Sequence, residues 1–358
     1  MSLQKLDIYN VRNILNASLT PSPGLNFIYG DNASGKSSLL EAIFILGRAR
    51  SYRTIHIKQA INFNHNDLIV SGKSLQKNGS SFQLGIQTDG KEFEIRINQM
   101  PHQPRHQLAY ALPIQLIEPK SYRLLDSGPQ IRREFIDWGV FNDDENFLPA
   151  WRQFKTALKQ RNALLKMKRP GHIEVWNKEL VNYGTIVAEL RQQYIKRLES
   201  VFKTIIGEFL TFDTIVLNLL TGWDHEVGFE RALIDDLEKD LRYGFTHSGP
   251  HRCDLQVSVN GWLARDYVSR GQLKLLVLGL KLAQVKLLQL EHSNVGCILI
   301  DDFTAELDSG NRDKLLKYLA HLDFQVFMTA TELLEFGDIS QMPVYKVFHV
   351  EHGQVKQL

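Results

Sequence analysis

The chain has 358 residues, of which 43% are hydrophobic and 23% charged, and its formal net charge is +2. This is a soluble globular composition, too long for one ordinary core, so we expect about two domains or one domain with a large insertion. No window approaches about 18 uninterrupted apolar residues, and no basic segment precedes an apolar stretch at the N-terminus, so we expect no membrane span and no signal peptide. Cys253 and Cys297 have no CxxC partner, which favours a reduced, cytoplasmic protein.

The first part of the chain mixes strands with one helix. Residues 3–11 predict a strand, and a second apolar strand over 25–29 leads directly into a glycine-rich loop. Residues 38–46 then predict a helix. Residues 67–98 alternate between apolar and polar side chains and contain two glycine turn signals, so they predict antiparallel hairpins.

The middle of the chain is basic and helical. Between Arg152 and Lys203 there are twelve Lys and Arg but only four Asp and Glu. Apolar and aromatic residues recur every three or four positions over 176–205, which predicts a long helix. A shorter stripe over 151–165 predicts an antiparallel partner, with the break between them at Arg169-Pro170-Gly171. The pattern therefore favours a helical hairpin.

The last part returns to alternating helices and strands. Residues 272–290 predict a long helix, and residues 295–300 an apolar strand that ends in two aspartates. A helix over 311–322 and a short strand over 326–328 follow, and 344–350 predicts a closing strand. This alternation is typical of an α/β fold.

Residues 30–37 complete the phosphate-binding pattern GxxxxGK[ST] between a predicted strand and a predicted helix. The glycines let backbone N–H groups wrap around phosphates at the positive end of a helix, so the sequence predicts bound ATP. Lys36 supplies charge to the β- and γ-phosphates, and the Ser37 hydroxyl is a ligand for Mg²⁺. The expected nucleotide-binding residues of this loop are Gly30, Asp31, Asn32, Ala33, Ser34, Gly35, Lys36, Ser37 and Ser38.

The two aspartates that follow the strand at 297–300 are candidates for catalysis. Asp301 suits coordination of Mg²⁺, and Asp302 suits polarising an attacking water. Taken alone, the pair is equally consistent with a solvated acidic turn. Its combination with the phosphate loop favours the functional interpretation.

A third element lies at the start of the long helix. The segment Ser269-Arg270-Gly271-Gln272 offers a serine and a glycine N–H at a helix N-terminus, which suits an anion, although a simple helix cap has the same pattern. The acidic strand follows, then Glu306-Leu307-Asp308, and then Thr329-Ala330-Thr331. This order resembles the signature, Walker B, D-loop and switch segments of the ABC ATPases. The resemblance implies that Ser269, Gly271, Gln272 and Asp308 contact ATP across a homodimer that forms only with ATP.

Longer segments resemble the RecF family of bacterial DNA replication and repair proteins, in the ABC/SMC-like class. They include KLDIYNVRN, YGDNASGKSSLLEAI, GRARSYRT, PIQLIEPKSYRLLDSGPQIRREFIDW, THSGPHRCDL, VSRGQLKLL and LIDDFTAELD. Arg270 in the signature and Asp302 as the second acid are also typical of that family. The segments extend over nearly the whole chain.

The resemblance implies an ABC-type P-loop ATPase head with an antiparallel β subdomain and an inserted helical lobe. We therefore expect the head in residues 1–120 and 245–358 and the lobe in residues 121–244. Gln115 is a weak candidate for the Q-loop residue.

Members of the RecF family bind duplex DNA as ATP-dependent dimers near single-strand gaps and act with RecO and RecR to help load RecA. The resemblance implies the same partners here, no membrane, and a weak ATPase that resets a switch. Two alternatives stay open: an ATPase subunit of a membrane transporter, and an ATP-gated protein scaffold without DNA binding. The basic region 152–203 could contact DNA or be a solvated helical face. A second basic run could contact DNA, nucleotide or a dimer partner, and it contains Arg48, Arg50, Arg53, His56 and Lys58.

Overall fold

The computed structural model describes residues 2–75, 79–169, 171–291, 296–304 and 307–358. The chain divides into two compact units. The first combines Met1–Ser121 with Gln289–Leu358, and the second is Tyr122–Leu288. Among the described residues, none of the helices has the length and apolar character that crossing a bilayer requires.

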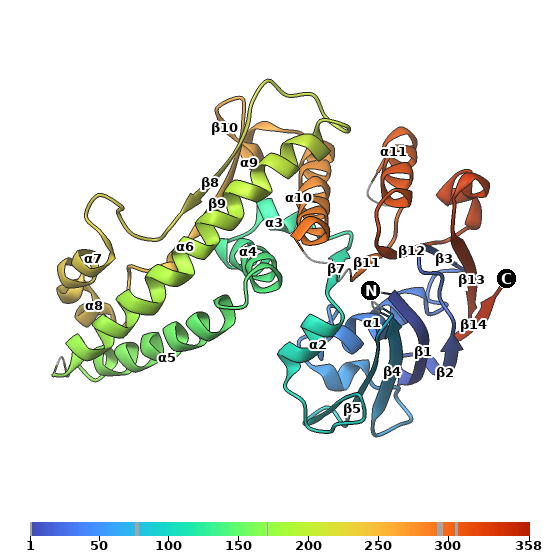
Figure 1. The fold of residues 1–358 in the computed structure, drawn as a ribbon, viewed down its shortest axis with the longest axis horizontal. Helices are drawn as coiled ribbons and strands as arrows, with labels where there is room; N and C mark the ends of the chain where they lie inside the picture. Colours follow the sequence, from blue (N-terminus) through green and yellow to red (C-terminus); the bar gives the residue numbers. More distant parts are fainter. Residues whose placement is uncertain (1, 76–78, 170, 292–295, 305–306) are drawn as a thin grey trace. The chain divides into compact units, whose positions relative to one another are not determined.

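The first unit contains two sheets (Figure 1). The five-stranded sheet is antiparallel, in the order β2-β1-β4-β5-β6, and consists of β1 (Ser2–Val11), β2 (Ile14–Leu19), β4 (Leu68–Leu75), β5 (Ser81–Thr88) and β6 (Phe93–Ile97). The six-stranded sheet, in the order β14-β13-β3-β12-β11-β7, is parallel except for β14. Its strands are β3 (Leu25–Tyr29), β7 (Ile114–Ile117), β11 (Cys297–Ile300), β12 (Gln325–Ala330), β13 (Tyr345–Glu351) and β14 (Gln354–Gln357).

Helix α1 (Lys36–Arg48) forms the centre of the first unit. It contacts β1, β4 and β5 of the antiparallel sheet and β7 and β12 of the mixed sheet, so it lies between the two. Residues 38–47 are all buried. A helix that is apolar on every face is buried on every face, and the segment SLLEAIFILG has this character apart from Glu41. Shorter elements complete the unit: η1 (Ile57–Ala60), α2 (Arg105–Ala111), α11 (Ser309–Ala320), η3 (Leu333–Phe336) and η4 (Ile339–Gln341).

The second unit is built on a helical hairpin. Helices α5 (Phe147–Lys166) and α6 (Ile173–Ile206) pack along each other (Figure 1). A three-stranded antiparallel sheet, in the order β10-β9-β8, packs beside them. The remaining elements are α3 (Arg123–Asp126), α4 (Pro129–Asp143), β8 (Ile215–Leu220), α7 (Phe229–Asp235), α8 (Leu237–Tyr243), η2 (Pro250–Arg252), β9 (Asp254–Val259), β10 (Trp262–Leu263), α9 (Ala264–Tyr267) and α10 (Arg270–Glu291).

The boundary of the second unit differs from the expected lobe at its C-terminal end. The sequence predicts a lobe that ends at residue 244, whereas the compact unit continues to Leu288. The reason is strand pairing: β9 pairs with β8 over six residues and joins the segment after residue 244 to the lobe. The signature segment therefore belongs to the unit that contains the hairpin.

Most predicted elements are present with small shifts at their ends. The strand predicted over 25–29 is β3, and the hairpin strands over 67–98 are β4, β5 and β6. The helices predicted over 151–165 and 176–205 are α5 and α6. Some positions in the predicted elements lie outside the described residues: Asn78 in a predicted hairpin turn, Pro170, Val295 and Glu306.

Charged side chains inside the second unit are paired. Arg161 and Asp240 are fully buried, with Nη1 and Oδ2 2.6 Å apart. Arg161 also donates to Asn177 Oδ1 and Thr246 Oγ1, and Asp240 accepts from the backbone N–H of His247. A buried guanidinium needs such partners, because an unpaired buried charge is costly. Part of the basic character of region 152–203 is therefore structural and does not face solvent.

Replacing Asp240 by Ala should lower the free energy of unfolding by about 3–5 kcal/mol, because it leaves the Arg161 guanidinium buried without its counter-ion. Urea-induced unfolding, followed by far-ultraviolet circular dichroism, measures the change. Asp235→Ala is the matched control, since Asp235 pairs with Arg231 at an exposed site, and it should cost less than about 1 kcal/mol. Equal effects of the two substitutions would contradict the assignment of Asp240 as a structural counter-ion.

His251 is a second buried polar group in this unit. Its Nε2 lies 2.9 Å from the carbonyl oxygen of Thr246, and its ring packs near Phe154. The Nδ1 atom is buried and has no hydrogen-bond partner among the described residues. Burial lowers the pKa of His251 to about 4, so the ring is neutral in the folded protein at pH 5–6.

The unfolded chain should therefore bind a proton at His251 near pH 6.5 that the folded chain does not bind until about pH 4. Stability from this residue is present above pH 6.5 and is lost as the pH falls toward 4, by up to about 3 kcal/mol. His251→Gln keeps a donor for Thr246 and should flatten the pH dependence of unfolding in this window. His65→Gln, at an exposed histidine, should leave it unchanged. Identical pH profiles for His251→Gln and the parent would disprove the assignment.

Candidate functional site

The loop between β3 and α1 has the backbone geometry of a phosphate cradle. Gly30 and Gly35 have φ of 151° and 125°, values that residues with a Cβ atom rarely adopt. Lys36 Nζ donates to the carbonyl oxygens of Gly30 and Asp31, at 2.6 and 2.8 Å, and so holds its ammonium within the loop. The N-cap residue of α1 is Gly35, which has no side chain to accept from the first N–H groups of the helix, so these groups are directed out of its N-terminus.

Asp301 connects this loop to the acidic strand. The Ser37 hydroxyl donates to Asp301 Oδ1 at 2.9 Å, and Thr329 Oγ1 donates to the same oxygen at 3.0 Å. The Tyr52 hydroxyl donates to Oδ2 at 2.8 Å. Burial raises the pKa of Tyr52, and the Asp301 charge acts in the same direction, so the phenol stays a hydrogen-bond donor. Asp301 is thus fixed by side chains from three segments distant in sequence.

Asp302 has a strained backbone. Its φ of 55° lies in the left-handed region, which costs a non-glycine residue roughly 1–2 kcal/mol. The Asp302 N–H donates to Thr329 Oγ1 at 2.8 Å, and this contact holds the conformation. Its side chain is exposed, unlike the buried strand that precedes it. Strain of this kind commonly marks a functional position.

A buried carboxylate organises the other side of the loop. Glu41 of α1 is fully buried and accepts hydrogen bonds from Arg12 Nε and Nη2, at 2.9 and 3.0 Å. It also accepts from Ser51 Oγ at 2.5 Å and from Arg53 Nη1 at 3.4 Å. These contacts fix the turn after β1 and the segment after α1 against the helix.

Asn13 fastens the phosphate loop from outside. Its Nδ2 donates to the carbonyl oxygens of Ser34 and Ala33, at 3.0 and 3.3 Å. Its Oδ1 accepts from Ser38 Oγ at 2.8 Å. The loop is thereby held at both its tip and its junction with α1.

These residues surround a cavity of about 560 Å³ in the first unit. Of the residues that the sequence predicts for the nucleotide and the metal, the lining contains Asn32, Ala33, Gly35, Lys36, Ser37, Ser38, Asp301 and Asp302. The other lining residues are Arg12, Asn13, Arg53, Thr329, Ala330 and Thr331. Gly30, Asp31 and Ser34 belong to the same loop but do not line the cavity.

The remaining predicted site residues have local structural roles. Ser269 begins α10 with a reciprocal cap: its Oγ accepts from the Gln272 N–H at 3.3 Å, and its own N–H donates to Gln272 Oε1 at 3.0 Å. Gly271 lies exposed in the first turn of this helix. Asp308 caps α11 and accepts from the Asn311 N–H at 2.9 Å. None of these residues lines the cavity described above, so their contact with nucleotide stays a prediction.

The cavity suits a nucleoside triphosphate with a divalent cation. The helix N–H groups and Lys36 provide the donors that phosphates require. Ser37 and Asp301 present adjacent oxygens, the ligand type that Mg²⁺ prefers. Because Mg²⁺ is usually held by one or two protein groups together with substrate phosphates, two oxygens suffice.

Lys36 is poised for an anion. Burial lowers the pKa of Lys36, and the charges of Asp301, Asp302, Asp31 and Glu335 oppose that effect. A phosphate bound beside the ammonium would add another negative charge, and this charge would stabilise the protonated form of Lys36.

Sequence reasoning missed several residues that shape this site. Arg12, Asn13, Glu41 and Tyr52 all lie in segments that resemble the RecF family, which is the signal the sequence offers, but no role in the site was predicted for any of them. Gln115, the weak Q-loop candidate, lies inside β7 opposite Ile298 and does not line the cavity.

Comparison with known proteins identifies the family. A model described as the RecF/RecN/SMC N terminal domain matches residues 2–356. The chain is 42% identical over 357 residues to the DNA replication and repair protein RecF of Shewanella piezotolerans, with 99% of each chain covered. It is 41% identical to the protein of the same name from Shewanella oneidensis, with the same coverage.

Solved structures agree. The recombination mediator protein RecF-ATPrS in the RecFOR pathway superposes with a TM-score of 0.88 at 26% identity, covering 99% of this chain and 98% of that one. RecF-ATP gives 0.87 at 27% identity, covering 100% and 97%. The Smc head domain of Pyrococcus furiosus, at 14% identity and a TM-score of 0.60 over 100% and 96% of the two chains, shares the fold. The expected fold, an ABC-type ATPase head with a helical insertion, is confirmed.

Lys36→Ala should weaken binding of ATP by about 10- to 100-fold, because it removes a charge-assisted hydrogen bond worth about 1.5–3 kcal/mol. Isothermal titration calorimetry with ATP and Mg²⁺ measures the change. Lys73→Ala, at an exposed lysine of β4 outside the cavity, should have no effect. Unchanged affinity in Lys36→Ala would contradict the assignment of the loop.

Proposed function

The chain belongs to the RecF family of the RecF, RecN and SMC proteins, and we propose that it is an ATP-switched, DNA-binding recombination mediator. The observation that carries the proposal is the hydrogen bond between Ser37 and Asp301, which joins the phosphate loop to the acidic strand. Two related structures named RecF-ATP and RecF-ATPrS support ATP as the nucleotide. The relatives named DNA replication and repair protein support a role in DNA repair.

The proposed roles of the site residues follow their positions. The N–H groups at the start of α1 and the Lys36 ammonium bind the β- and γ-phosphates. Ser37 and Asp301 hold Mg²⁺, which neutralises charge on the phosphates when it is bound. Asp302, exposed beside the cavity, orients the attacking water. A single weak base of this kind suits slow hydrolysis, which resets a switch.

We further propose that ATP joins two copies of the chain. Ser269 and Gly271 at the exposed start of α10 would bind the γ-phosphate held by the partner copy, with Gln272 and Asp308 beside it. The reciprocal cap between Ser269 and Gln272 supports this assignment, because it fixes the serine at the helix end while leaving its hydroxyl proton available to a ligand.

In this proposal the ATP-bound dimer binds duplex DNA near single-strand gaps and acts with RecO and RecR to help load RecA in the cytoplasm. The phrase RecFOR pathway in the names of two related structures supports RecO and RecR as partners. An ATP-gated scaffold without DNA binding is the alternative that the experiment below separates, since it predicts the dimer but no duplex affinity.

Sedimentation of the purified protein with ATP and Mg²⁺ should convert a monomer into a dimer, and only the dimer should carry a short DNA duplex. Ser269→Arg should keep ATP binding but prevent the dimer, because a bulky cation replaces the hydroxyl at the helix end. Ser81→Arg, at an exposed serine of β5, is the control and should dimerise like the parent. A monomer in every condition would refute the ATP-driven switch. A dimer without duplex affinity would favour the alternative, an ATP-gated scaffold that does not bind DNA.

A further inference from the structure

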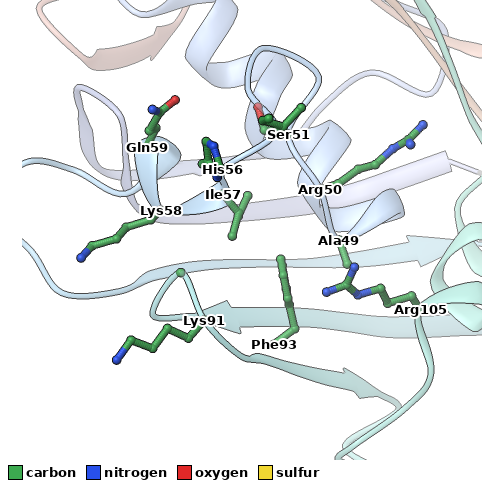
Figure 2. Close-up of a pocket in the computed structure, with 12 residues that line it drawn as sticks. Ala49, Arg50, Ser51, His56, Ile57, Lys58, Gln59, Lys91, Phe93 and Arg105 are labelled. Carbon is green, nitrogen blue, oxygen red and sulfur yellow. The ribbon is translucent and has the colours of Figure 1, made fainter.

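A second pocket opens on the first unit, apart from the loop that precedes α1. It has a volume of about 630 Å³ and lies between the segment after α1, the turn that joins β5 to β6, and the start of α2 (Figure 2). We call it the basic pocket. Its lining residues are Ala49, Arg50, Ser51, Ile55, His56, Ile57, Lys58, Gln59, Gly90, Lys91, Phe93 and Arg105.

The charges of the basic pocket all have one sign. Four of its lining residues are cations, Arg50, Lys58, Lys91 and Arg105, and no lining residue is acidic. All four are exposed, and none forms an ion pair with another described residue. Cations gathered in one pocket repel one another, so an anion that enters the pocket relieves that repulsion.

The turn that joins β5 to β6 is held against η1 and is fixed by a side-chain hydrogen-bond acceptor. A Cβ atom added at Gly90 would lie 2.6 Å from Lys58 Cβ, so the turn and η1 touch. Asp89 Oδ1 accepts from the N–H groups of Lys91 and Glu92, at 2.8 and 3.0 Å, and fixes the turn. Two lysines from separate segments are thereby held at one end, where Figure 2 shows Lys58 and Lys91 extending toward the same side.

An aromatic ring and an arginine form the other end. The Arg105 guanidinium lies 4.4 Å from the centre of the Phe93 ring, an attractive cation–π contact. Because the guanidinium is held against the ring, its N–H groups are pre-oriented, which favours a bidentate contact with a phosphate. The basic pocket thus offers cations at two separate ends, a pattern that suits a ligand with more than one anionic group.

The neighbouring strand edge is poorly suited to an acidic peptide. β6 is the last strand of its sheet, and a peptide would bind there by adding a strand. However, the Gln103 N–H already donates to the Ile95 carbonyl oxygen at 3.0 Å, and Met100 bridges to Ile97. The basic pocket is positively charged, but the edge of β6 beside it is already hydrogen-bonded. This combination favours a phosphodiester backbone over a polypeptide as the ligand.

We propose that the basic pocket binds the phosphodiester backbone of DNA, with Lys58 and Lys91 on one phosphate and Arg105 on another. The proposal rests on the proposed function, in which the chain binds duplex DNA, and it assigns contact residues to that activity. It also divides the basic run after α1. Arg53 lines the nucleotide cavity, Arg48 turns inward to the Ile114 carbonyl oxygen, and Arg50, His56 and Lys58 line the basic pocket.

The segment after α1 contributes Ser51 to the basic pocket and Arg53 to the nucleotide cavity. Ser51 lines the basic pocket, and its hydroxyl donates to Glu41, the carboxylate that also holds Arg12 and Arg53 of the cavity. The next residue, Tyr52, donates to Asp301. A phosphate contact in the basic pocket is therefore separated from the nucleotide cavity by one short, hydrogen-bonded segment.

The test is duplex binding by the full chain with saturating ATP and Mg²⁺. Fluorescence anisotropy with a short blunt-ended DNA duplex, repeated over a series of salt concentrations, gives both affinity and salt slope. The double variant Lys58→Gln/Lys91→Gln should lose about tenfold in affinity per lost phosphate contact at about 0.1 M salt, and its salt slope should become shallower by about 0.9 per contact. Arg105→Gln should behave in the same way.

The matched control is Lys73→Gln/Lys356→Gln, which neutralises two exposed lysines of the same unit outside the basic pocket. It should keep the affinity and slope of the parent. If the parent binds duplex and both pocket variants bind it equally well, the proposal is overturned while the proposed function stands, and an acidic protein segment becomes the better occupant. If a pocket variant loses duplex only because it no longer dimerises with ATP in sedimentation, the proposal is also overturned. A parent without duplex affinity refutes the proposed function itself.

Discussion

One buried negative charge organises the first unit. Glu41 lies in the middle of α1, within a run (residues 39–47) that is otherwise apolar and is enclosed by two sheets, where an unpaired carboxylate would be strongly unfavourable. Its partners come from two other segments: Arg12 from the turn after β1, and Ser51 and Arg53 from the segment after α1. Satisfying this single charge therefore requires both segments to lie against the helix. The walls of the nucleotide cavity and of the basic pocket follow from that requirement.

The nucleotide site is assembled in the same way, from polar groups that fix one another. Asp301 accepts from Ser37, Tyr52 and Thr329, which lie on α1, on the segment after it, and on β12. Each donor satisfies the carboxylate and is itself held in place. A site built from mutual hydrogen bonds is largely formed before a ligand arrives, which lowers the ordering cost of binding.

The sequence predicts the parts of this molecule that depend on local patterns. The strand before the phosphate loop, the long amphipathic helix α6 and the strand at 297–300 each have a periodicity or motif of their own, and the structure contains all three. β7 is four residues long and follows a proline, so its local pattern does not separate it from a loop. β9 is different: its segment DLQVSV alternates polar and apolar residues and is followed by Asn260-Gly261, so it carries a strand and hairpin signal although it is not among the elements predicted above. The C-terminal boundary of the second unit likewise could not be predicted from the local sequence around residue 244, because the pairing of β9 with β8 decides it.

The same distinction holds for the candidate site. Lys36 and Asp301 belong to motifs whose spacing reflects phosphate and metal chemistry, so the sequence predicts them. Glu41 and Tyr52 act through partners between 10 and 249 positions away, and such contacts exist only after the chain has folded. Ser269 shows the opposite difficulty, since a helix cap and a phosphate contact require the same residue at the same place.

The length of α6, the long helix of the second unit, determines how far a small rotation at one end displaces the other end. α6 has 34 residues, which corresponds to about 51 Å at about 1.5 Å per residue. Because α5 packs along it, the pair forms a stiff rod with little room to bend. A tilt of about 5° at one end of such a rod carries the other end through about 4 Å, a distance larger than a hydrogen bond. Small adjustments at the base of the hairpin are therefore enough to make or break contacts at its tip.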